Sequence, residues 1–392
     1  MKSNYKSIGE LVDRIDERNK DGSITTLIGV SIDKRFIPSV ANVIGTDLTT
    51  YKVIRKYDFA VSLMQVSRDE KIPVACQKEY DAAIMSPAYP IFRVKDENVI
   101  LPEYLEMWFM RSEFDREASF VAVGGVRGSM PWEEFAKLRL PVPNIEVQRD
   151  IVSSYKTITD RITLKKQIND NLAAIAQAVF EDCFAEYYIG TTALPSGWKK
   201  STFADVCQIN GGKRLPAECE FANSVTSHPY VRIRDMYQGK YLELMEDFEY
   251  IDDEVFSYIK NYIVSSGDVI IAIVGITSGE IAIIGESLDG ANLTENCVKL
   301  TNFKGVTAEY LYCYWQYLRK SGGVEPLLVG AAQPKLPMYN IQAVPVIVPD
   351  AATMTTYQKS TTSLAKAVIN NMQEIKYLRE MQQLMVSRLS SC

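Results

Sequence analysis

The feature that most constrains the fold of this chain is an internal repeat at a constant offset of 206 residues. The segment GGVRGSMPWEEFAKLRLPVP at 124–143 aligns without gaps with GAAQPKLPMYNIQAVPVIVP at 330–349. Upstream, Pro102-Glu103-Tyr104-Leu105 aligns with Ala308-Glu309-Tyr310-Leu311 at the same offset. A long offset kept without gaps indicates duplicated structural units. The chain of 392 residues is therefore predicted to contain two related halves.

Each repeat is followed by a long segment without proline or glycine, in which apolar residues recur three and four positions apart. This spacing places one apolar stripe along a helix and is typical of helices that pair. We call this stripe the helix-pair seam, and its predicted members are Ile158, Ile162, Leu172 and Val179 in the first helix and Leu364, Val368, Ile375, Leu378, Met385 and Leu389 in the second. Polar residues interrupt both stripes, namely Lys165, Asn169, Asn371 and Gln382, and such breaks fix register and orientation. The alternative is that each helix packs separately on its own domain.

The predicted order along the chain is domain, helix, domain, helix. The boundaries are a first domain at 1–143, a central helix at 144–188, a second domain at 189–349 and a distal helix at 350–392. Runs typical of strands occur in both domains, namely LIGVSID at 27–33, DFAVSLMQV at 58–66, YPIFRV at 89–94, VRIR at 231–234 and VIIAIVGI at 269–276. The predicted fold is α+β, with two β-rich domains separated by two long antiparallel helices that form a coiled-coil spacer, and with a pseudo-two-fold internal repeat.

Composition removes several classes of chemistry. The chain has one histidine, His228, which we expect to be a loop residue rather than a catalytic base, and its seven cysteines show no C-x-x-C spacing. We therefore predict no metal site and no catalytic centre. A nuclease pattern built from Pro349-Asp350 and Glu374-Ile375-Lys376 is disfavoured because the Glu and Lys lie on a predicted helix, and no phosphate-binding G-x-x-x-x-G-K-[ST] loop occurs.

The same data bear on location and partners. The longest apolar run, Val269 to Ile276, is too short to cross a bilayer, and the polar N-terminal segment does not resemble a signal peptide. We expect a soluble, cytoplasmic protein without membrane contact. The net charge of −6 indicates that DNA binding would depend on local basic groups and on a basic partner.

Particular segments of the sequence resemble a known family. LPSGWKKSTFADV at 194–206, YVRIRDMYQG at 230–239 and GDVIIAIVGITSG at 267–279 look like the opening strands of a target-recognition domain of type I restriction–modification specificity subunits. The stretch from Pro141 to Phe184 resembles the central spacer helix of that family, and AVPVIVP at 343–349 resembles the approach to the distal helix. The first domain departs from this pattern, because it lacks the Leu-Pro-x-Gly-Trp opening found at 194–198.

The resemblance implies a function. It implies a non-catalytic subunit that binds a bipartite double-stranded DNA target, together with two adenine methyltransferase subunits and, in a full complex, restriction and translocase subunits. The chain itself would bind no cofactor, and S-adenosylmethionine would belong to the methyltransferase. The Asn/Asp-Pro-Pro-aromatic tetrapeptide of adenine methyltransferases does not occur here. A helix of about 35 residues is roughly 50 Å long, against roughly 34–36 Å for one turn of B-DNA, so the helices could set the gap between two half-sites.

Candidate DNA contacts are basic or amide side chains on predicted loops and strand ends, because these groups recognise phosphates and base edges. In each case the alternative is a solvated surface residue. The candidates are Lys213 and Arg214 on a glycine loop, Arg232 and Arg234 on one predicted strand face, Gln333 and Lys335 with their equivalents Arg127 and Ser129, and Lys34, Arg35, Arg68 and Lys71 in the first domain.

Two other functions are open on the sequence alone. The first is a non-enzymatic scaffold, in which two β-rich domains bind ligands at the ends of a coiled coil. The second is a catalytic subunit, which the missing motifs argue against.

Overall fold

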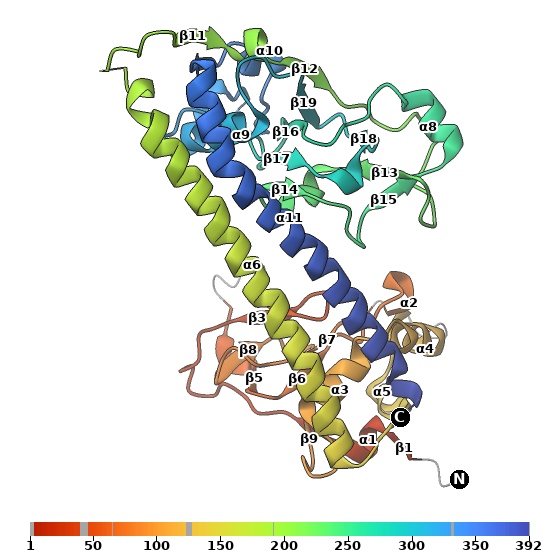
Figure 1. Ribbon diagram of the computed structural model, residues 1–392. Helices are drawn as coiled ribbons and strands as arrows, with labels where there is room; N and C mark the ends of the chain where they lie inside the picture. Colours follow the sequence, from red (N-terminus) through yellow and green to blue (C-terminus); the bar gives the residue numbers. More distant parts are fainter. Residues whose placement is uncertain are drawn as a thin grey trace. The chain divides into compact units, whose positions relative to one another are not determined.

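The computed structural model of the chain describes residues 4–39, 46–64, 66–122, 128–190, 192–330 and 333–391. It divides into two compact units (Figure 1). Unit 1 consists of residues 1–161 and 378–392, and unit 2 consists of residues 162–377. Two long helices, α6 (Ile145–Tyr188) and α11 (Ala351–Ser387), contribute residues to both units. The mixture of helices and short strands in each unit confirms the predicted α+β class.

Unit 1 is built on a four-stranded antiparallel sheet in the order β2-β9-β6-β7, accompanied by the pairs β1-β10, β3-β4 and β5-β8. Its aromatic core joins the sheet to the helices, since Phe59 stacks on Phe92 at 5.2 Å and both rings meet Phe109 edge-on. The elements are β1 (Tyr5–Ser7), α1 (Ile8–Leu11), β2 (Val12–Ile15), β3 (Ile28–Val30), β4 (Phe36–Pro38), η1 (Leu48–Thr50), β5 (Lys52–Arg55), β6 (Phe59–Val61), α2 (Val66–Asp69), β7 (Val74–Cys76), β8 (Ala82–Met85), β9 (Ile91–Val94), α3 (Pro102–Phe109), α4 (Ser112–Ala122), α5 (Trp132–Lys137), β10 (Arg139–Pro141) and η6 (Arg388–Ser391).

Unit 2 contains a five-stranded sheet in the order β12-β19-β16-β17-β14, a three-stranded sheet in the order β15-β13-β18 and the pair β11-β20. Its core includes Trp315, which is fully buried and donates its indole N–H to the carbonyl of Gly279 at 2.8 Å. The elements are β11 (Lys199–Thr202), α7 (Phe203–Val206), β12 (Gln208–Gly211), β13 (His228–Val231), η3 (Ile233–Gln238), β14 (Tyr241–Leu242), β15 (Glu249–Ile251), α8 (Asp253–Ile259), β16 (Val269–Ala272), β17 (Ile281–Ile284), η4 (Glu286–Leu288), β18 (Asn292–Leu293), β19 (Cys297–Thr301), α9 (Ala308–Lys320), η5 (Glu325–Leu327), α10 (Met338–Gln342) and β20 (Pro345–Val348).

The internal repeat is confirmed by the positions of the elements. The pairs α3 and α9, α5 and α10, β10 and β20, and α6 and α11 each begin 206 residues apart. A side-chain contact repeats at the same offset. The hydroxyl of Tyr104 donates to the carbonyl of Pro141 at 3.3 Å, and that of Tyr310 donates to the carbonyl of Ile347 at 2.8 Å. Both tyrosines are fully buried, so each hydrogen bond ties a repeat helix to the strand that precedes a long helix.

The long helices run antiparallel where they pair in unit 2. Phe184 near the end of α6 packs against Tyr357 near the start of α11, with ring centroids 5.2 Å apart, while Lys165 pairs with Glu374 at 2.8 Å. In unit 1, Gln382 donates to the hydroxyl of Thr159 at 2.7 Å. The helix-pair seam lies on the covered face of each helix, except for Leu389, which lies beyond the end of α11 in η6 and joins the core of unit 1. Its buried members are Ile158, Ile162, Val368, Ile375, Leu378 and Leu389, and its half-buried members are Leu172, Val179, Leu364 and Met385.

Several predicted strands were too long. Of the run at 27–33 only Ile28–Val30 is a strand. Among the described residues of the run at 58–66 only Phe59–Val61 is a strand, and Val66 already begins helix α2. The alternation at 231–234 was also misinterpreted. Strand β13 ends at Val231, and the chain turns into η3 because the carboxylate of Asp235 accepts the backbone N–H of Arg232 at 2.7 Å. A side chain that caps a turn in this way competes with strand pairing.

Candidate nucleic-acid interface

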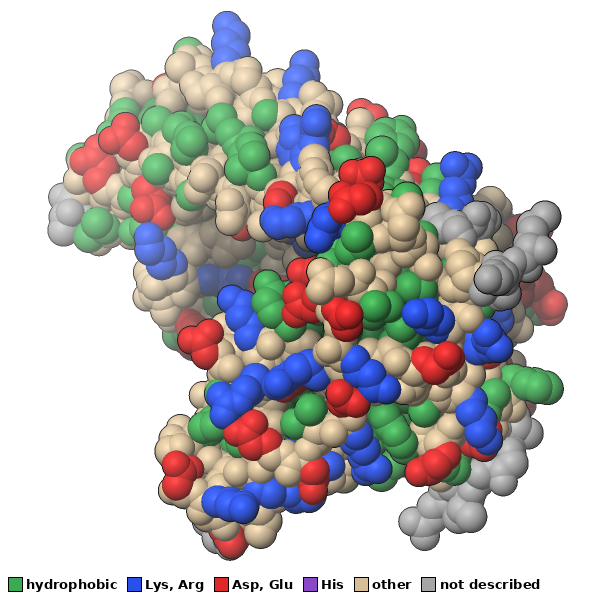
Figure 2. Space-filling view, turned by 90° about the horizontal axis from the view of Figure 1, so that it is seen from below, with side chains coloured by type: hydrophobic (Ala, Val, Ile, Leu, Met, Phe, Trp, Pro, Cys, Tyr) green, Lys and Arg blue, Asp and Glu red, His purple; other side chains and the backbone are tan. Residues whose placement is uncertain are grey.

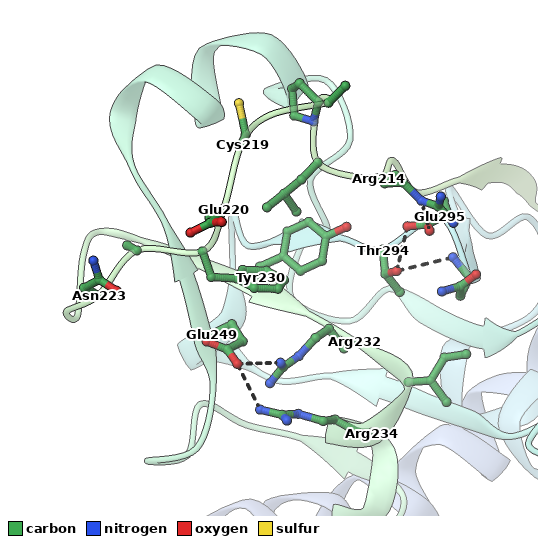
Figure 3. Close-up of a pocket in the computed structure, with 17 residues that line it drawn as sticks. Arg214, Cys219, Glu220, Asn223, Tyr230, Arg232, Arg234, Glu249, Thr294 and Glu295 are labelled. Atoms are coloured by element: carbon green, nitrogen blue, oxygen red, sulfur yellow. Dashed lines mark hydrogen bonds and ion pairs between the residues drawn. The ribbon is translucent and has the colours of Figure 1, made fainter. Parts of the chain in front are cut away.

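Unit 2 contains an open groove of about 920 Å³, which we call the unit 2 groove (Figure 3). It lies among the segment that follows β12, the end of β13 and the residues before β19. Its charged lining residues are three cations, Arg214, Arg232 and Arg234, and three acids, Glu220, Glu249 and Glu295. The groove therefore holds the cation types that contact phosphates and guanine, together with an equal number of carboxylates.

Gly212, which precedes Lys213, packs closely against another segment of the backbone. A Cβ on Gly212 would lie 2.0 Å from the carbonyl oxygen of Thr294, so no larger residue fits. The backbone N–H groups of Gly212 and Lys213 donate to the carbonyls of Cys297 and Leu293, at 3.0 and 2.8 Å. This glycine packs the chain against its own backbone and does not form a free loop, and it places Lys213 and Arg214 at the edge of the groove.

The two cations at this edge are exposed, but they differ in their contacts. Lys213 has its ammonium 5.8 Å from the centre of the Tyr262 ring. Arg214 donates from Nε to Glu295 at 2.7 Å, although 78% of its side chain is exposed. Burial raises the pKa of Glu295, but the hydrogen bonds from Arg214, from the backbone and from Thr294, together with the charge of Arg214, outweigh burial, so the pKa lies below its usual value of 4.5.

Arg232 and Arg234 converge on one carboxylate, although they do not share a strand face. Arg232 lies at the end of β13 and Arg234 in η3, and Figure 3 shows both side chains directed at Glu249. The distances to Glu249 Oε1 are 2.8 Å from Arg232 and 3.3 Å from Arg234. Arg232 also lies 3.4 Å from the buried Asp235, and its side chain is only 16% exposed, against 60% for Arg234. Arg232 is thus largely structural, and Arg234 is the more accessible cation.

Aromatic residues of the groove were missed from the sequence. Tyr230 on β13 packs edge-on against Phe221 at 5.4 Å, and the Arg232 guanidinium lies 5.5 Å from the centre of the Phe221 ring. The hydroxyl of Tyr230 donates to the carbonyl of Lys213 at 2.7 Å, and burial raises the pKa of Tyr230 to about 12. The signal that could have found the Arg232 contacts is the spacing Arg-x-x-Asp, since an acid three residues on commonly caps a turn.

Gln333 and Lys335 have exposed side chains on a second loop of unit 2. Between them, the carbonyl of Pro334 accepts from the backbone N–H of Gly275 at 3.0 Å and from the hydroxyl of Ser278 at 3.2 Å. These bonds bring the loop beside the turn after β16, where Ile276 is fully exposed. Two loops thus present polar and apolar side chains together, which suits contact with base edges or with a thymine methyl group.

The unit 1 candidates are less uniform. The ammonium of Lys34 lies 2.8 Å from Asp115 and donates to the carbonyl of Phe109, and its side chain is only 9% exposed. Burial lowers the pKa of Lys34. Lys34 therefore joins the hairpin β3-β4 to helix α4 and is not available for DNA. Arg35 and Lys71 are exposed, Arg68 pairs with Asp69 at 2.8 Å, Ser129 is half-buried, and Arg127 lies outside the described residues.

Four further features of the described residues bear on function: the histidine, possible metal ligands, possible membrane spans and surface charge. His228 begins strand β13 and is not a loop residue as predicted; it stacks on Phe256 at 3.9 Å and lies 2.8 Å from Asp253. Over the described ranges, no cluster of three His, Cys, Asp or Glu residues could hold a metal ion. No helix in these ranges combines the length and hydropathy that a bilayer span requires. On the face that Figure 2 shows, basic and acidic side chains are interspersed.

Comparison with known proteins identifies relatives. Residues 195–377 match the family described as type I restriction modification DNA specificity domain. The chain is 20% identical over 317 residues to the type I restriction enzyme MjaIX specificity subunit of Methanocaldococcus jannaschii, covering 74% of this chain and 68% of that protein. It is 22% identical over 188 residues to the type I restriction enzyme HindI specificity subunit of Haemophilus influenzae, covering 46% of this chain and only 40% of that protein. In fold it is similar to the crystal structure of the type-I restriction-modification system S subunit from M. genitalium, with a TM-score of 0.50, 15% identity and coverage of 98% and 95% of the two chains.

Proposed function

We propose that the chain is a type I restriction–modification specificity subunit that binds a bipartite double-stranded DNA target, because residues 195–377 match the DNA specificity domain of that family and two similar proteins are specificity subunits. Each unit reads one half of the target, and the paired helices α6 and α11 set the unread gap between the halves. The exposed arginines of the unit 2 groove, Arg214 and Arg234, contact phosphates, and the loop that carries Gln333 and Lys335 contacts base edges.

One observation carries this proposal: the repeats share a framework but differ in the side chains they expose. The hydrogen bonds of Tyr104 and Tyr310 are equivalent, as are the starts of four pairs of elements. At the same offset, however, Ser129 of unit 1 corresponds to Lys335 of unit 2, and the first is half-buried whereas the second is exposed. A common scaffold with different surface chemistry is what two readers of different half-sites require.

We further propose that the long helices bind two methyltransferase subunits. In unit 2, helix α6 exposes Leu164, Ile168 and Ile175, with exposed fractions of 57%, 36% and 50%. In unit 1, helix α11 exposes Met381 at 50% and Leu384 at 57%. Apolar residues spaced three, four and seven positions apart on the outer face of a helix favour docking of a partner helix.

Chemistry belongs to the partners in this proposal. The chain supplies recognition, S-adenosylmethionine is bound by the methyltransferase, and any DNA cleavage or translocation is the task of a restriction subunit. The absence of methyltransferase, phosphate-loop and histidine-based motifs in the sequence supports this division.

The proposal is tested by mixing the chain with its methyltransferase and a pool of random duplex DNA, and by sequencing the bound fraction. We expect enrichment of two short motifs separated by a fixed number of unread base pairs. A scaffold with two β-rich domains for other ligands would give no enriched motif.

A further inference from the structure

Each arginine of the unit 2 groove is held by a carboxylate that lines the same groove. Arg214 pairs with Glu295 at 2.7 Å, and Arg232 and Arg234 share Glu249 at 2.8 and 3.3 Å (Figure 3). Cations in a surface that binds a polyanion would be expected to face solvent. Here the phosphate-binding groups already have anionic partners.

Glu249 is placed where a single anion is shared between two guanidinium groups. Its Oε1 atom accepts from one terminal nitrogen of Arg232 and one of Arg234. Arginine forks commonly bind phosphate oxygens in this manner, and a carboxylate presents similar oxygen acceptors with one negative charge. Glu249 therefore occupies the position that a DNA phosphate would take between these arginines.

The two arginines depend on Glu249 to different degrees. Arg232 is 16% exposed and keeps a second partner, Asp235, which is almost fully buried. Arg234 is 60% exposed and lies 3.8 Å from Asp235, beyond hydrogen-bonding distance, and it also donates to the neutral backbone carbonyl of Asp247 at 3.3 Å. Ion pairs with exposed partners contribute little stability, because water and salt compete with them. The contact between Arg234 and Glu249 can thus be exchanged for a phosphate without unfolding the turn that holds Arg232.

We propose that a phosphate of the DNA backbone binds at Arg234, with Arg232 behind it, by displacing Glu249, which acts as a built-in competitor that weakens sequence-independent binding. This inference rests on the proposed function of DNA recognition. Sequence-independent binding consists almost wholly of phosphate contacts and counterion release, so a competing carboxylate acts on it directly. Glu295 holds Arg214 in the same way at another position of the groove.

The experiment uses the full chain bound to its methyltransferase and measures affinity for a fluorescent duplex of arbitrary sequence across a salt series. Glu249→Gln keeps the side-chain length and its hydrogen-bonding oxygen but removes the charge. We expect affinity to rise by about three- to tenfold at low salt, and the slope of log affinity against log salt to steepen by up to about one. The matched control is Glu254→Gln, which makes the same change of charge in an exposed turn of α8 outside the groove and should leave affinity unchanged.

A double variant separates a local effect from a general one. In the Arg234→Gln background, Glu249→Gln should no longer raise affinity, because the cation it releases is gone. Equal gains from Glu249→Gln and Glu254→Gln, or a gain that persists without Arg234, would overturn the inference while leaving DNA recognition intact. If the wild-type complex binds no duplex at all, the proposed function fails and this inference fails with it.

Discussion

Lys165 and Asn371, which occupy equivalent positions of the two repeats, hydrogen-bond to each other, with Lys165 Nζ 2.8 Å from Asn371 Oδ1. In an antiparallel pair of related helices, equivalent positions come opposite each other at one level only. Asn371 also donates to Asn169 at 2.8 Å, and Lys165 pairs with Glu374 at 2.8 Å. A polar layer at this level fixes the register of α6 and α11, because any shift along the helices would leave these groups unpaired among apolar neighbours.

Lys165→Met should destabilise the helix pair. It removes one donor from the polar layer and leaves the buried Asn371 carbonyl oxygen without that hydrogen bond, at a cost of about 1 kcal/mol. Amide hydrogen exchange of residues 365–375 in α11 measures the change. Lys156→Met is the control, since Lys156 and Asp160 form an exposed pair on the same helix and the substitution should cost little. If the two substitutions change hydrogen exchange equally, the polar layer does not fix the register of the helices.

Gly212→Ala should destabilise unit 2 by about 1 to 3 kcal/mol, because the added Cβ would meet the backbone carbonyl of Thr294 at 2.0 Å. The neighbouring Gly211→Ala is a matched control, since its Cβ would make ordinary contact with Met338 Cε at 3.7 Å. Hydrogen exchange of β19, which pairs with β12, reports the difference. If the amides of β19 are equally protected from exchange in both variants, the close packing of this turn is not required for stability.

The Arg214–Glu295 pair should make unit 2 sensitive to acid. The pKa of Glu295 is lower in the folded chain than its usual 4.5, so the pair contributes its full stability above about pH 4.5. That contribution is lost as the pH falls through the lower, folded pKa. Arg214→Gln should therefore flatten the fall of stability below pH 4.5, measured as the denaturant midpoint of unit 2 across a pH series. An unchanged acid slope would show that Arg214 does not set the pKa of this carboxyl group.

The parts of the fold that depend on periodic patterns could be predicted from the sequence. The apolar spacing of Ile158 and Ile162 requires a covered helix face, and the constant offset from Tyr104 to Tyr310 requires equivalent positions in two related units. The apolar spacing and the constant offset are both visible in the sequence itself and need no knowledge of contacts between distant residues.

The charged contacts could not be predicted in the same way. Lys34 looks like a solvated loop cation until the fold brings Asp115 to it from 81 positions away, and Arg234 meets Glu249 across a turn and a strand. Whether a cation is free for DNA depends on partners distant in sequence. The requirement for glycine at position 212 was not predicted for the same reason, because the carbonyl that Gly212 accommodates belongs to Thr294.

Shortening both helices should shorten the gap in the DNA target. Removing seven residues from α6 and the seven that face them in α11 keeps the apolar spacing and shortens the pair by about 10 Å, or roughly three base pairs. The motif enriched from random DNA should then have a shorter gap, or specific binding should be lost. A gap of unchanged length would show that the helices do not set the spacing.

The central claim, that each unit reads one half of a bipartite target, is tested most directly by comparing the motifs selected by the wild-type chain and by a Gln333→Ala/Lys335→Ala variant, each bound to the methyltransferase. These side chains are exposed in unit 2, so truncating them should leave the fold intact. We predict that the variant loses sequence preference in one half-site and keeps the other half-site and the gap. Equal loss of preference in both halves, or a wild-type motif without a gap, would contradict the account.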